Sequence, residues 1–527
     1  MRILAVLLMS AVGCLTVAAS AQDFSKYSKE ALREFIWEEA VAEKKRLVQM
    51  RDGVGLSTNI YYPKNVTQSL PAILWRTPYN FNELSLEQLR NIARAVSKGY
   101  VYILQNERGR YFSEGDFEAL LGRPRTDGYD MLTWIADQEW SNGKVGTLGC
   151  SSSAEWQLAL AAMDHPAHAA MVPMGAGSGI GRVGQFYSQG NLYRGGAMRD
   201  VYTAYLYELD NPLRALVPTG LSQKTRAHIG EYNDLEVRKK EVDWAKHIWD
   251  LPLKKILSNL GEPKGLFENF IEKKPNDPAW YEGGLFHDNE TWGVPSLWFN
   301  SWYDLSISPN IALYNHAKKT AVDNTVRDNQ YLVIAPTPHC DFDLLGPDTI
   351  VGERYMGDTS FEVDAMVMAW FDRWLKDDVT AFGTEVPTVQ YYNMGKNKWQ
   401  AGDSFPPQNQ QSVRLYLHSN GKANSLYGDG KLSAERPIGS QPSDHYVYDP
   451  MNPVQTIGGG ECCNGGLVEP GAMDQRLIEA RHDVLVYTSE PLENPLEVTG
   501  FIDAVLYVSS DVLDTDFTLK LVDVAPD

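Results

Sequence analysis

Short runs of β-branched and aromatic residues alternate with helical patterns over the first third of the chain, and this alternation limits the fold most strongly. The strand-like runs are Ala72–Trp75, Tyr100–Leu104 and Val145–Leu148, and the helix-like segments are 86–98, 127–137 and 154–163. Strands that alternate with helices form βαβ units around a mostly parallel sheet. The sequence therefore predicts an α/β fold from about residue 45 to 178.

The pattern changes in the middle of the chain and then returns. From about residue 182 to 287 the sequence is helical and charged, with few strand-like runs. Runs typical of buried strands resume at Ser296–Asn300 and Tyr331–Ala335, followed by an amphipathic helix pattern over 361–375. The middle region therefore has the character of an insertion. The expected boundaries are an α/β domain over 22–178 and 288–385 and a helical cap over 179–287.

Beyond about residue 385 the helical patterns almost disappear and strand-like runs take over. These runs are separated by turn residues and lie at 388–392, 413–417, 445–448, 484–487, 504–508 and 517–522. Many short strands with turns between them predict a β-sandwich over 386–527. The sequence stops directly after the last run, so we expect this domain to be incomplete.

Length and charge restrict the class of protein further. A chain of 527 residues is too long for one hydrophobic core, which predicts two to four domains. The formal net charge of −20 argues against nucleic acid or an anionic membrane surface as a partner. Beyond the N-terminus no stretch is long and apolar enough to span a bilayer. The oligomeric state is not predicted.

The N-terminus has the features of a secretory signal peptide. Met1-Arg2 supplies a positive charge, residues 3–18 are apolar, and Ala19-Ser20-Ala21 is an A-x-A cleavage site. We therefore expect cleavage after Ala21 and a secreted or periplasmic protein. The alternative is a lipoprotein signal ending at Cys14, but the residues before Cys14 match a lipobox poorly.

Four cysteines lie beyond the predicted signal peptide: Cys150, Cys340, Cys462 and Cys463. None has the Cys/His spacing of a zinc site, and we expect neither a metal nor a cofactor. Cys462 and Cys463 are adjacent in a glycine-rich stretch over 458–466. Two thiols and a redox-sensitive loop are both open for this pair.

The segment Gly149-Cys150-Ser151-Ser152-Ser153 joins a strand-like run to a helix-like stretch. A strand, a sharp turn and a helix form a nucleophile elbow, with the serine hydroxyl at the tip of the turn. Ser151 is therefore a candidate nucleophile, although the G-x-S-x-G pattern has glycine where Ser153 stands. The alternative is a serine-rich turn that caps the next helix.

Two further residues follow predicted strands in the order that a serine nucleophile requires. Asp304 comes after the run 297–303, and His339 comes after 331–335 and a turn. α/β-hydrolases carry Ser, an acid and His in this order, and open α/β sheets place their sites at the carboxyl ends of strands. Singly each is more typical of a structural role, but together Ser151, Asp304 and His339 predict a catalytic triad.

The oxyanion of an acyl-transfer intermediate needs two hydrogen-bond donors. One is the backbone N–H of Ser152, directly after the candidate nucleophile. The loop after the strand 72–75 offers the Tyr79 hydroxyl as the second. The alternative for Tyr79, an aromatic residue after proline, is a packing role.

A series of motifs in one order carries a family resemblance. The motifs are Arg51–Leu56, Arg76–Tyr79, Glu107–Arg110, Ser113–Gly115, Asp127–Asp130, Trp134-Ile135, Trp140–Gly146, Gly149–Ser151, Trp302–Asp304, Asp474–Arg476, Arg481–Tyr487, Val498–Gly500 and Asp514–Phe517. Together they resemble the cocaine esterase and Xaa-Pro dipeptidyl-peptidase (CocE/NonD) family of serine hydrolases, which includes α-amino-acid ester hydrolases and glutaryl-cephalosporin acylases.

The resemblance implies an α/β-hydrolase domain, an inserted helical cap and a C-terminal jelly roll. It matches Ser151 with the nucleophile, Asp304 and His339 with the relay, and Tyr79 with the side-chain oxyanion donor. The chain departs from the family pattern G-x-S-Y-x-G, because Ser152 and Ser153 stand where the tyrosine and a following small residue are expected.

These observations predict an exported serine hydrolase that cleaves a small ester or acyl amide through an acyl-enzyme. No acidic pair follows Asp304, because Leu305–Ile307 stands where amino-ester hydrolases place theirs. Ester or acyl-amide hydrolysis is therefore favoured over Xaa-Pro dipeptidyl-peptidase or α-amino-acid ester hydrolase activity. The alternative from another class is a non-catalytic protein that binds a glycan or another partner.

Two details remain open. The glycine-rich stretch 175–181 lacks the spacing of a dinucleotide-binding motif, and a flexible hinge into the cap is favoured. Cys150 and Cys340 flank Ser151 and His339, and a disulfide between them would need Cα atoms within about 7 Å. Free thiols are favoured for this pair.

Overall fold

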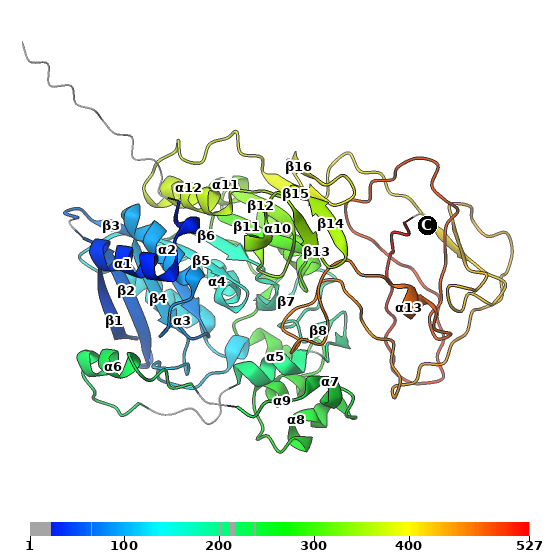
Figure 1. Ribbon diagram of the computed structural model, residues 1–527, viewed down its shortest axis with the longest axis horizontal. Helices are drawn as coiled ribbons and strands as arrows, with labels where there is room; N and C mark the ends of the chain where they lie inside the picture. Colours follow the sequence, from blue (N-terminus) through cyan, green and yellow to red (C-terminus); the bar gives the residue numbers. More distant parts are fainter. Residues whose placement is uncertain (1–22, 65, 201, 211–216, 237–238, 526–527) are drawn as a thin grey trace, which may run out of the picture.

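The computed structural model describes residues 23–64, 66–200, 202–210, 217–236 and 239–525. The predicted signal peptide, residues 1–21, lies outside the described residues. Figure 1 shows a large sheet flanked by helices, a helical region beneath it and a C-terminal region at its right. No described helix combines the length and apolarity needed to cross a membrane.

A ten-stranded sheet forms the centre of the molecule, in the order β1-β2-β4-β3-β5-β6-β11-β12-β15-β16. Its strands are β1 (Ala40–Gln49), β2 (Gly55–Pro63), β3 (Leu70–Thr77), β4 (Val101–Asn106), β5 (Ser141–Cys150), β6 (His168–Met174), β11 (Ser296–Tyr303), β12 (Gln330–Pro338), β15 (Val389–Asn393) and β16 (Lys398–Gly402). Neighbouring strands from β4 to β15 are parallel, and the outer pairs are antiparallel. The predicted α/β fold is confirmed.

Helices cover both faces of the sheet, which explains the continuously apolar strands. The helices of this domain are α1 (Lys29–Glu39), α2 (Leu86–Ser97), α3 (Pro124–Ala136), α4 (Ser152–Ala161), α10 (Ile307–Thr320), α11 (Asn324–Asp328) and α12 (Val363–Leu375). Ile73 and Trp75 of β3 pack in one core cluster with α1, α2 and α12, whereas Leu74 packs on the opposite face with α3 and α4. All ten residues of α4 are buried, so this helix lies at the centre of the domain.

The predicted helical insertion lies between β6 and β11. It contains α5 (Tyr202–Leu209), α6 (Gln223–Gly230), α7 (Trp244–His247), α8 (Ile256–Asn259) and α9 (Leu266–Ile271), with short strands β7 (Ile180–Arg182), β8 (Tyr193–Arg194), β9 (Ala197–Met198) and β10 (Phe286–His287). Tyr202, Leu206, Phe267 and Trp280 belong to a separate hydrophobic cluster of this region. The region therefore has a core of its own, as a cap has.

The C-terminal region differs from its prediction in two ways. The run 388–392 becomes β15, which pairs with β12, so the large sheet continues past the expected boundary at 385. Beyond β16, the only ladder among described residues joins β17 (Tyr416–His418) to β18 (Lys431–Ser433). The remaining elements here and before β15 are α13 (Arg476–Glu479), β13 (Thr349–Val351) and β14 (Arg354–Gly357).

The runs 445–448, 484–487, 504–508 and 517–522 form no ladder in the described structure. Tyr507 and Leu513 are fully exposed. Alternating apolar residues create one apolar face, but a strand also needs a neighbouring backbone with which to pair. The sandwich expected over 386–527 thus stays a prediction.

Candidate active site

Ser151 occupies a strained turn between β5 and α4. Its φ of 56° and ψ of −134° lie outside the regions that L-residues favour, which costs of order 1–3 kcal/mol. A Cβ on Gly149 would lie 2.1 Å from the Ser153 carbonyl oxygen, so the turn requires glycine before Cys150. The Ser151 side chain makes no capping hydrogen bond to α4. The local geometry is that of an elbow, and the helix-cap alternative does not describe Ser151.

The two serines that depart from the family pattern both hold neighbouring elements. The Ser153 hydroxyl donates to Thr77 Oγ1 at 2.8 Å, which ties the start of α4 to the end of β3. The Ser152 hydroxyl is hydrogen-bonded to the Tyr205 hydroxyl of cap helix α5. The Tyr205 hydroxyl oxygen also lies 3.3 Å from the Tyr79 hydroxyl oxygen. The cap thus contributes a tyrosine to the elbow, which no sequence pattern had indicated.

Desolvation raises the pKa of Tyr79 to about 12, and hydrogen bonds with Tyr205 and Ser152 oppose this rise. Tyr79 as a whole residue is 37% exposed. At neutral pH the Tyr79 hydroxyl therefore keeps its proton and is available as a donor.

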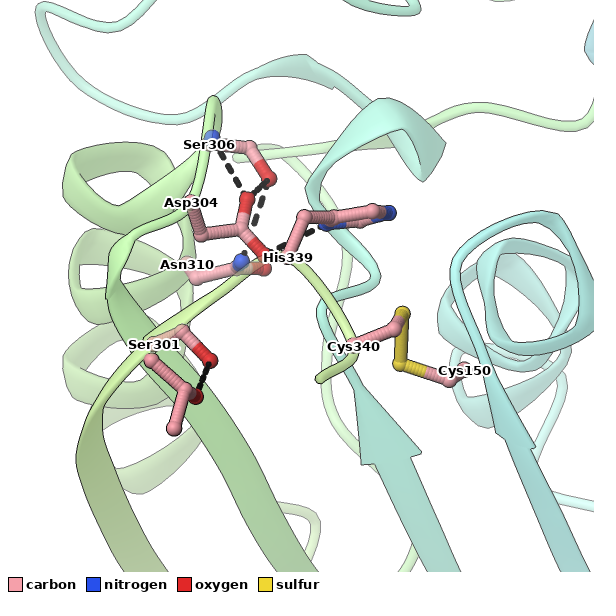
Figure 2. The surroundings of a disulfide bond; sticks show 8 residues. Cys150, Ser301, Asp304, Ser306, Asn310, His339 and Cys340 are labelled. Atoms are coloured by element: carbon pink, nitrogen blue, oxygen red, sulfur yellow. Dashed lines mark hydrogen bonds and ion pairs between the residues drawn. A yellow bond between two sulfur atoms is a disulfide. The ribbon is translucent and has the colours of Figure 1, made fainter. Parts of the chain in front are cut away.

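Asp304 and His339 form a close pair at the carboxyl ends of β11 and β12 (Figure 2). His339 Nδ1 lies 2.6 Å from Asp304 Oδ2. The other carboxylate oxygen accepts hydrogen bonds from the Ser306 backbone N–H at 2.8 Å and from its hydroxyl at 2.9 Å. Burial alone would raise the pKa of Asp304, but His339 and Ser306 outweigh it and hold that pKa below its usual range. Asp304 is thus a buried carboxylate that orients the imidazole.

The second nitrogen of His339 is free. Its Nε2 atom is buried and has no hydrogen-bond partner in the described structure, and its side chain is only 8% exposed. Burial favours the neutral imidazole, but the charge and hydrogen bond of Asp304 outweigh burial and raise the pKa of His339 to about 9. The ring therefore has one nitrogen fixed by a carboxylate and one available for proton transfer.

A disulfide joins the two candidate residues through their neighbours. Cys150 precedes Ser151, Cys340 follows His339, and their Cα atoms are 6.0 Å apart across the bond (Figure 2). The favoured prediction of free thiols was wrong for this pair. β6 and β11 lie between β5 and β12 in the sheet, so the bond connects the ends of non-adjacent strands. It restricts how far Ser151 and His339 can separate.

The glycine-rich stretch 175–181 packs against the acid. A Cβ on Gly175 would lie 2.9 Å from Asp304 Oδ2, and one on Gly177 would lie 2.2 Å from Ser306 Cβ. Close approach of the backbone to the Asp304 loop therefore accounts for Gly175 and Gly177, and the hinge into the cap stays a prediction.

A pocket beside the elbow is lined mainly by apolar residues of the cap and of the loops after β3 and β4. It also contains Ser152, Tyr205 and two carboxyl groups, Glu107 and Glu155. Burial raises the pKa of Glu107 to about 7 and that of Glu155 to about 8. Sequence patterns had not indicated Glu155, which faces this pocket from the first turn of α4.

The glycine-rich loop 458–466 comes from the C-terminal region and contacts the same site. A Cβ on Gly460 would lie 2.6 Å from the Asp304 carbonyl oxygen. Glu461 forms an ion pair of 2.6 Å with Arg199 of the cap. The Sγ atoms of Cys462 and Cys463 and one ring nitrogen of His339 all lie within 4.8 Å of one another. Both cysteines are free thiols.

Comparison with known proteins identifies the family. Residues 52–341 match the model of the X-Pro dipeptidyl-peptidase (S15) family, which is more than half of the chain. The chain belongs to the S15 family. Residues 380–527 of this S15-family chain match the C-terminal non-catalytic domain of X-Pro dipeptidyl-peptidases. The predicted family resemblance is therefore confirmed.

Individual relatives agree with this assignment. The chain is 30% identical to the cocaine esterase of Rhodococcus sp. (strain MB1 Bresler), over 91% of this chain and 80% of that protein. It is 25% identical to a putative serine esterase of Mycobacterium bovis (strain ATCC BAA-935 / AF2122/97), over 91% of this chain and 77% of that protein. This S15-family chain is a serine hydrolase, and the alternative of a non-catalytic binding protein is set aside.

Solved structures show the same fold. An aminopeptidase from a marine sediment Thaumarchaeota archaeon superposes with a TM-score of 0.64 and 25% identity, over 88% of this chain and 74% of that chain. An α-amino acid ester hydrolase superposes with a TM-score of 0.65 and 24% identity, over 93% of this chain and 77% of that chain. Together with the strand order, these likenesses establish an α/β-hydrolase fold.

Proposed function

We propose that Ser151, His339 and Asp304 form the catalytic triad of this hydrolase. The observation that carries the proposal is the buried Asp304–His339 pair with its free Nε2, connected by the Cys150–Cys340 disulfide to the elbow. His339 Nε2 takes the Ser151 proton while the serine oxygen attacks the substrate carbonyl carbon. Asp304 holds the ring and stabilises the imidazolium.

The Ser152 backbone N–H and the Tyr79 hydroxyl then bind the oxyanion of the tetrahedral intermediate. Tyr79 serves as a neutral donor because its raised pKa keeps the hydroxyl protonated. The hydrogen bonds of Tyr205 with Ser152 and Tyr79 support the position of these groups. Collapse of the intermediate transfers the His339 proton to the leaving group and leaves an acyl group on Ser151. Water, deprotonated by His339, attacks the acyl-enzyme and releases the acid.

We favour a small carboxylic ester or acyl amide as substrate. The pocket beside Ser152 is mainly apolar, and no acidic pair follows Asp304. A second candidate is an α-amino acyl substrate, because Glu107 and Glu155 could offer a carboxylate to an ammonium group in that pocket. Burial raises the pKa of both carboxyl groups, which disfavours this charge at neutral pH and places the α-amino acyl substrate second.

Export to an oxidising compartment is part of the proposal. Disulfides persist mainly in secreted and periplasmic proteins, and the Cys150–Cys340 bond fits that environment. The mature N-terminus should be Gln22, which intact-mass measurement of the exported protein would test. A precursor that keeps its full N-terminus in the cell would contradict export.

A substrate panel tests the activity. Simple esters, amino-acid esters, acyl-cephalosporins and Ala-Pro-anilide are compared on wild type and Ser151→Ala. We expect the highest kcat/KM with a simple ester or acyl amide and no turnover by Ser151→Ala. Fluorophosphonate labelling of Ser151→Ala equal to wild type would contradict the nucleophile assignment, and preference for Ala-Pro-anilide would favour dipeptidyl-peptidase activity.

A further inference from the structure

Two free thiols lie beside His339 and have no part in the proposed reaction. We propose that Cys462, Cys463 and His339 form a binding site for a thiophilic divalent cation, and that the bound cation blocks hydrolysis. Zn²⁺ is the probe that suits these ligands, because thiolates and imidazole are its preferred donors.

The distances fit such a site. The two Sγ atoms and one His339 ring nitrogen lie within 4.8 Å of one another. In a tetrahedral zinc site with Zn–S bonds of about 2.3 Å and Zn–N bonds of about 2.0 Å, ligand atoms are separated by roughly 3.5–3.8 Å. Closing this difference needs a shift of about 1 Å, which rotation of the cysteine side chains can supply. Water or a substrate group would take the fourth position.

His339 has one ring nitrogen held by a carboxylate and one that a cation can use. Its Nδ1 is held by Asp304 at 2.6 Å, which leaves the buried and unpartnered Nε2 for the cation. Histidine ligands of zinc commonly donate their other N–H to a carboxylate, which fixes the ring and increases its basicity. Asp304 is in turn held by Ser306. The imidazole is therefore pre-organised without the cation.

The loop 458–466 is anchored on both sides of the thiols. Gly459 and Gly471 exchange two backbone hydrogen bonds, of 2.7 and 2.9 Å. Gly460 packs against the Asp304 backbone, and Glu461 is paired with Arg199. These contacts keep both thiols at the triad and neutralise the nearest carboxylate of the loop.

Binding is balanced in charge and protons. Each thiol loses its proton to solvent, and Nε2 of His339 loses its proton as well when the ring is protonated. Two thiolates then neutralise a divalent cation, which favours its retention in a partly buried site. The cation occupies the lone pair of Nε2, so His339 cannot accept the Ser151 proton. This second step rests on the proposed function, whereas cation binding itself does not.

Cation binding is tested in the Ser151→Ala variant, which needs no activity. Co²⁺ added to the reduced-thiol protein should bind one per chain and give a thiolate-to-cobalt charge-transfer band in the near ultraviolet. The double variant Cys462→Ser/Cys463→Ser should lose the band, His339→Gln should weaken binding at least tenfold, and the exposed control His228→Gln should leave it unchanged. Absence of binding, or a band that survives in the double cysteine variant, would overturn the site.

Thiol content provides an independent check. An aromatic disulfide reagent should detect two reactive thiols per chain in protein purified without reductant, since Cys150 and Cys340 are bonded to each other. No reactive thiols would mean that Cys462 and Cys463 are oxidised, and the site would be overturned.

Inhibition is tested on the active enzyme. Zn²⁺ should inhibit wild type reversibly, and activity should return when the metal is chelated. With each enzyme compared with its own metal-free rate, half-inhibition of the double cysteine variant should need at least 100-fold more Zn²⁺ than half-inhibition of wild type. If Co²⁺ binds through the thiolates but Zn²⁺ does not inhibit, the binding site is supported and the proposed inhibition is overturned. Lack of metal-free hydrolysis on every substrate, with the cobalt band intact, would count against the proposed function alone.

Discussion

Two pairs of cysteines approach His339 from different parts of the chain, and only one pair is cross-linked. Cys150 and Cys340 are 190 residues apart in sequence and form a disulfide with a Cα separation of 6.0 Å. Cys462 and Cys463 are adjacent and remain thiols. Adjacent Cα atoms are about 3.8 Å apart, less than the roughly 4.4–6.8 Å that disulfides usually span. Position at the strand ends, and not nearness in sequence, decides which cysteines bond.

The difference gives the two pairs different consequences for the same imidazole. The bonded pair cross-links the end of β5 to the loop after β12 and so limits how far Ser151 and His339 can separate. The thiol pair brings polarisable sulfur atoms to His339 without a covalent restraint. The bonded pair is therefore a structural cross-link, and the thiol pair supplies potential metal ligands.

Substitution of His339, which lies beside both cysteine pairs, should have the largest effect. His339→Ala removes the proposed base and the nitrogen ligand together. We expect kcat to fall by about 10⁴- to 10⁶-fold, as for loss of a triad member. Steady-state ester hydrolysis measures this, with the exposed His228→Gln as control. Activity within tenfold of wild type would remove His339 from the mechanism.

Opening the bonded pair should have the next largest effect. Cys150→Ser/Cys340→Ser should lower the free energy of unfolding by about 2–5 kcal/mol, because the unfolded chain regains freedom. We also expect a lower kcat at nearly unchanged KM, since Ser151 and His339 are less firmly held. Denaturant unfolding and steady-state kinetics measure the two changes.

The matched control is Cys462→Ser/Cys463→Ser, which removes the same number of sulfur atoms but no cross-link. Its free energy of unfolding should change by less than about 1 kcal/mol. Equal destabilisation by both double variants would contradict the contrast between the pairs.

The pH dependence should report the Asp304–His339 contact. Burial lowers the pKa of His339, but Asp304 outweighs it and raises that pKa to about 9. Since the neutral ring is the base, kcat/KM should rise with pH and reach half its maximum near pH 9. In Asp304→Asn the residual activity should be half-maximal at lower pH, because the carboxylate that stabilises the imidazolium is gone. An unchanged midpoint would contradict this cause.

The Asp304–His339 contact should also make the free energy of unfolding depend on pH in a defined direction. His339 has a folded-state pKa above its ordinary value of 6.5, so its contribution is fully present below about pH 6.5 and is lost as pH rises through about 9. Asp304 has a lowered pKa, so its contribution is lost only in acid. The stability difference between wild type and Asp304→Asn should therefore shrink as pH rises from 6.5 to 9.

Removing the cap hydroxyl should have the smallest effect. Tyr205→Phe deletes the hydrogen bonds to Ser152 and Tyr79. Each hydrogen bond is worth about 0.5–1.5 kcal/mol, so loss of both predicts a fall in kcat/KM of at most about 5- to 160-fold. Tyr207→Phe on the same helix is the control, because its hydroxyl donates to the Lys240 carbonyl. Equal losses in the two variants would assign Tyr205 a packing role only.

In the C-terminal region the strand-like sequence patterns did not predict how the strands pair. Residues 388–392 had a clear strand pattern and form a strand, but in the large sheet and not in a sandwich. Runs such as 504–508 have the same pattern and no ladder in the described structure. Alternation states which side chains share a face, whereas pairing depends on which backbone lies alongside.

The sequence by itself determined the α/β hydrolase fold, the helical insertion and the order of Ser151, Asp304 and His339, because these depend on local periodicity and on residues that follow strands. Only the tertiary structure decided that Cys150 bonds to Cys340, that Tyr205 joins the elbow and that the thiols of Cys462 and Cys463 lie beside His339. Such contacts join distant segments, and their distances follow from strand order and packing. The spacing of residues along the chain gives neither the strand order nor the packing.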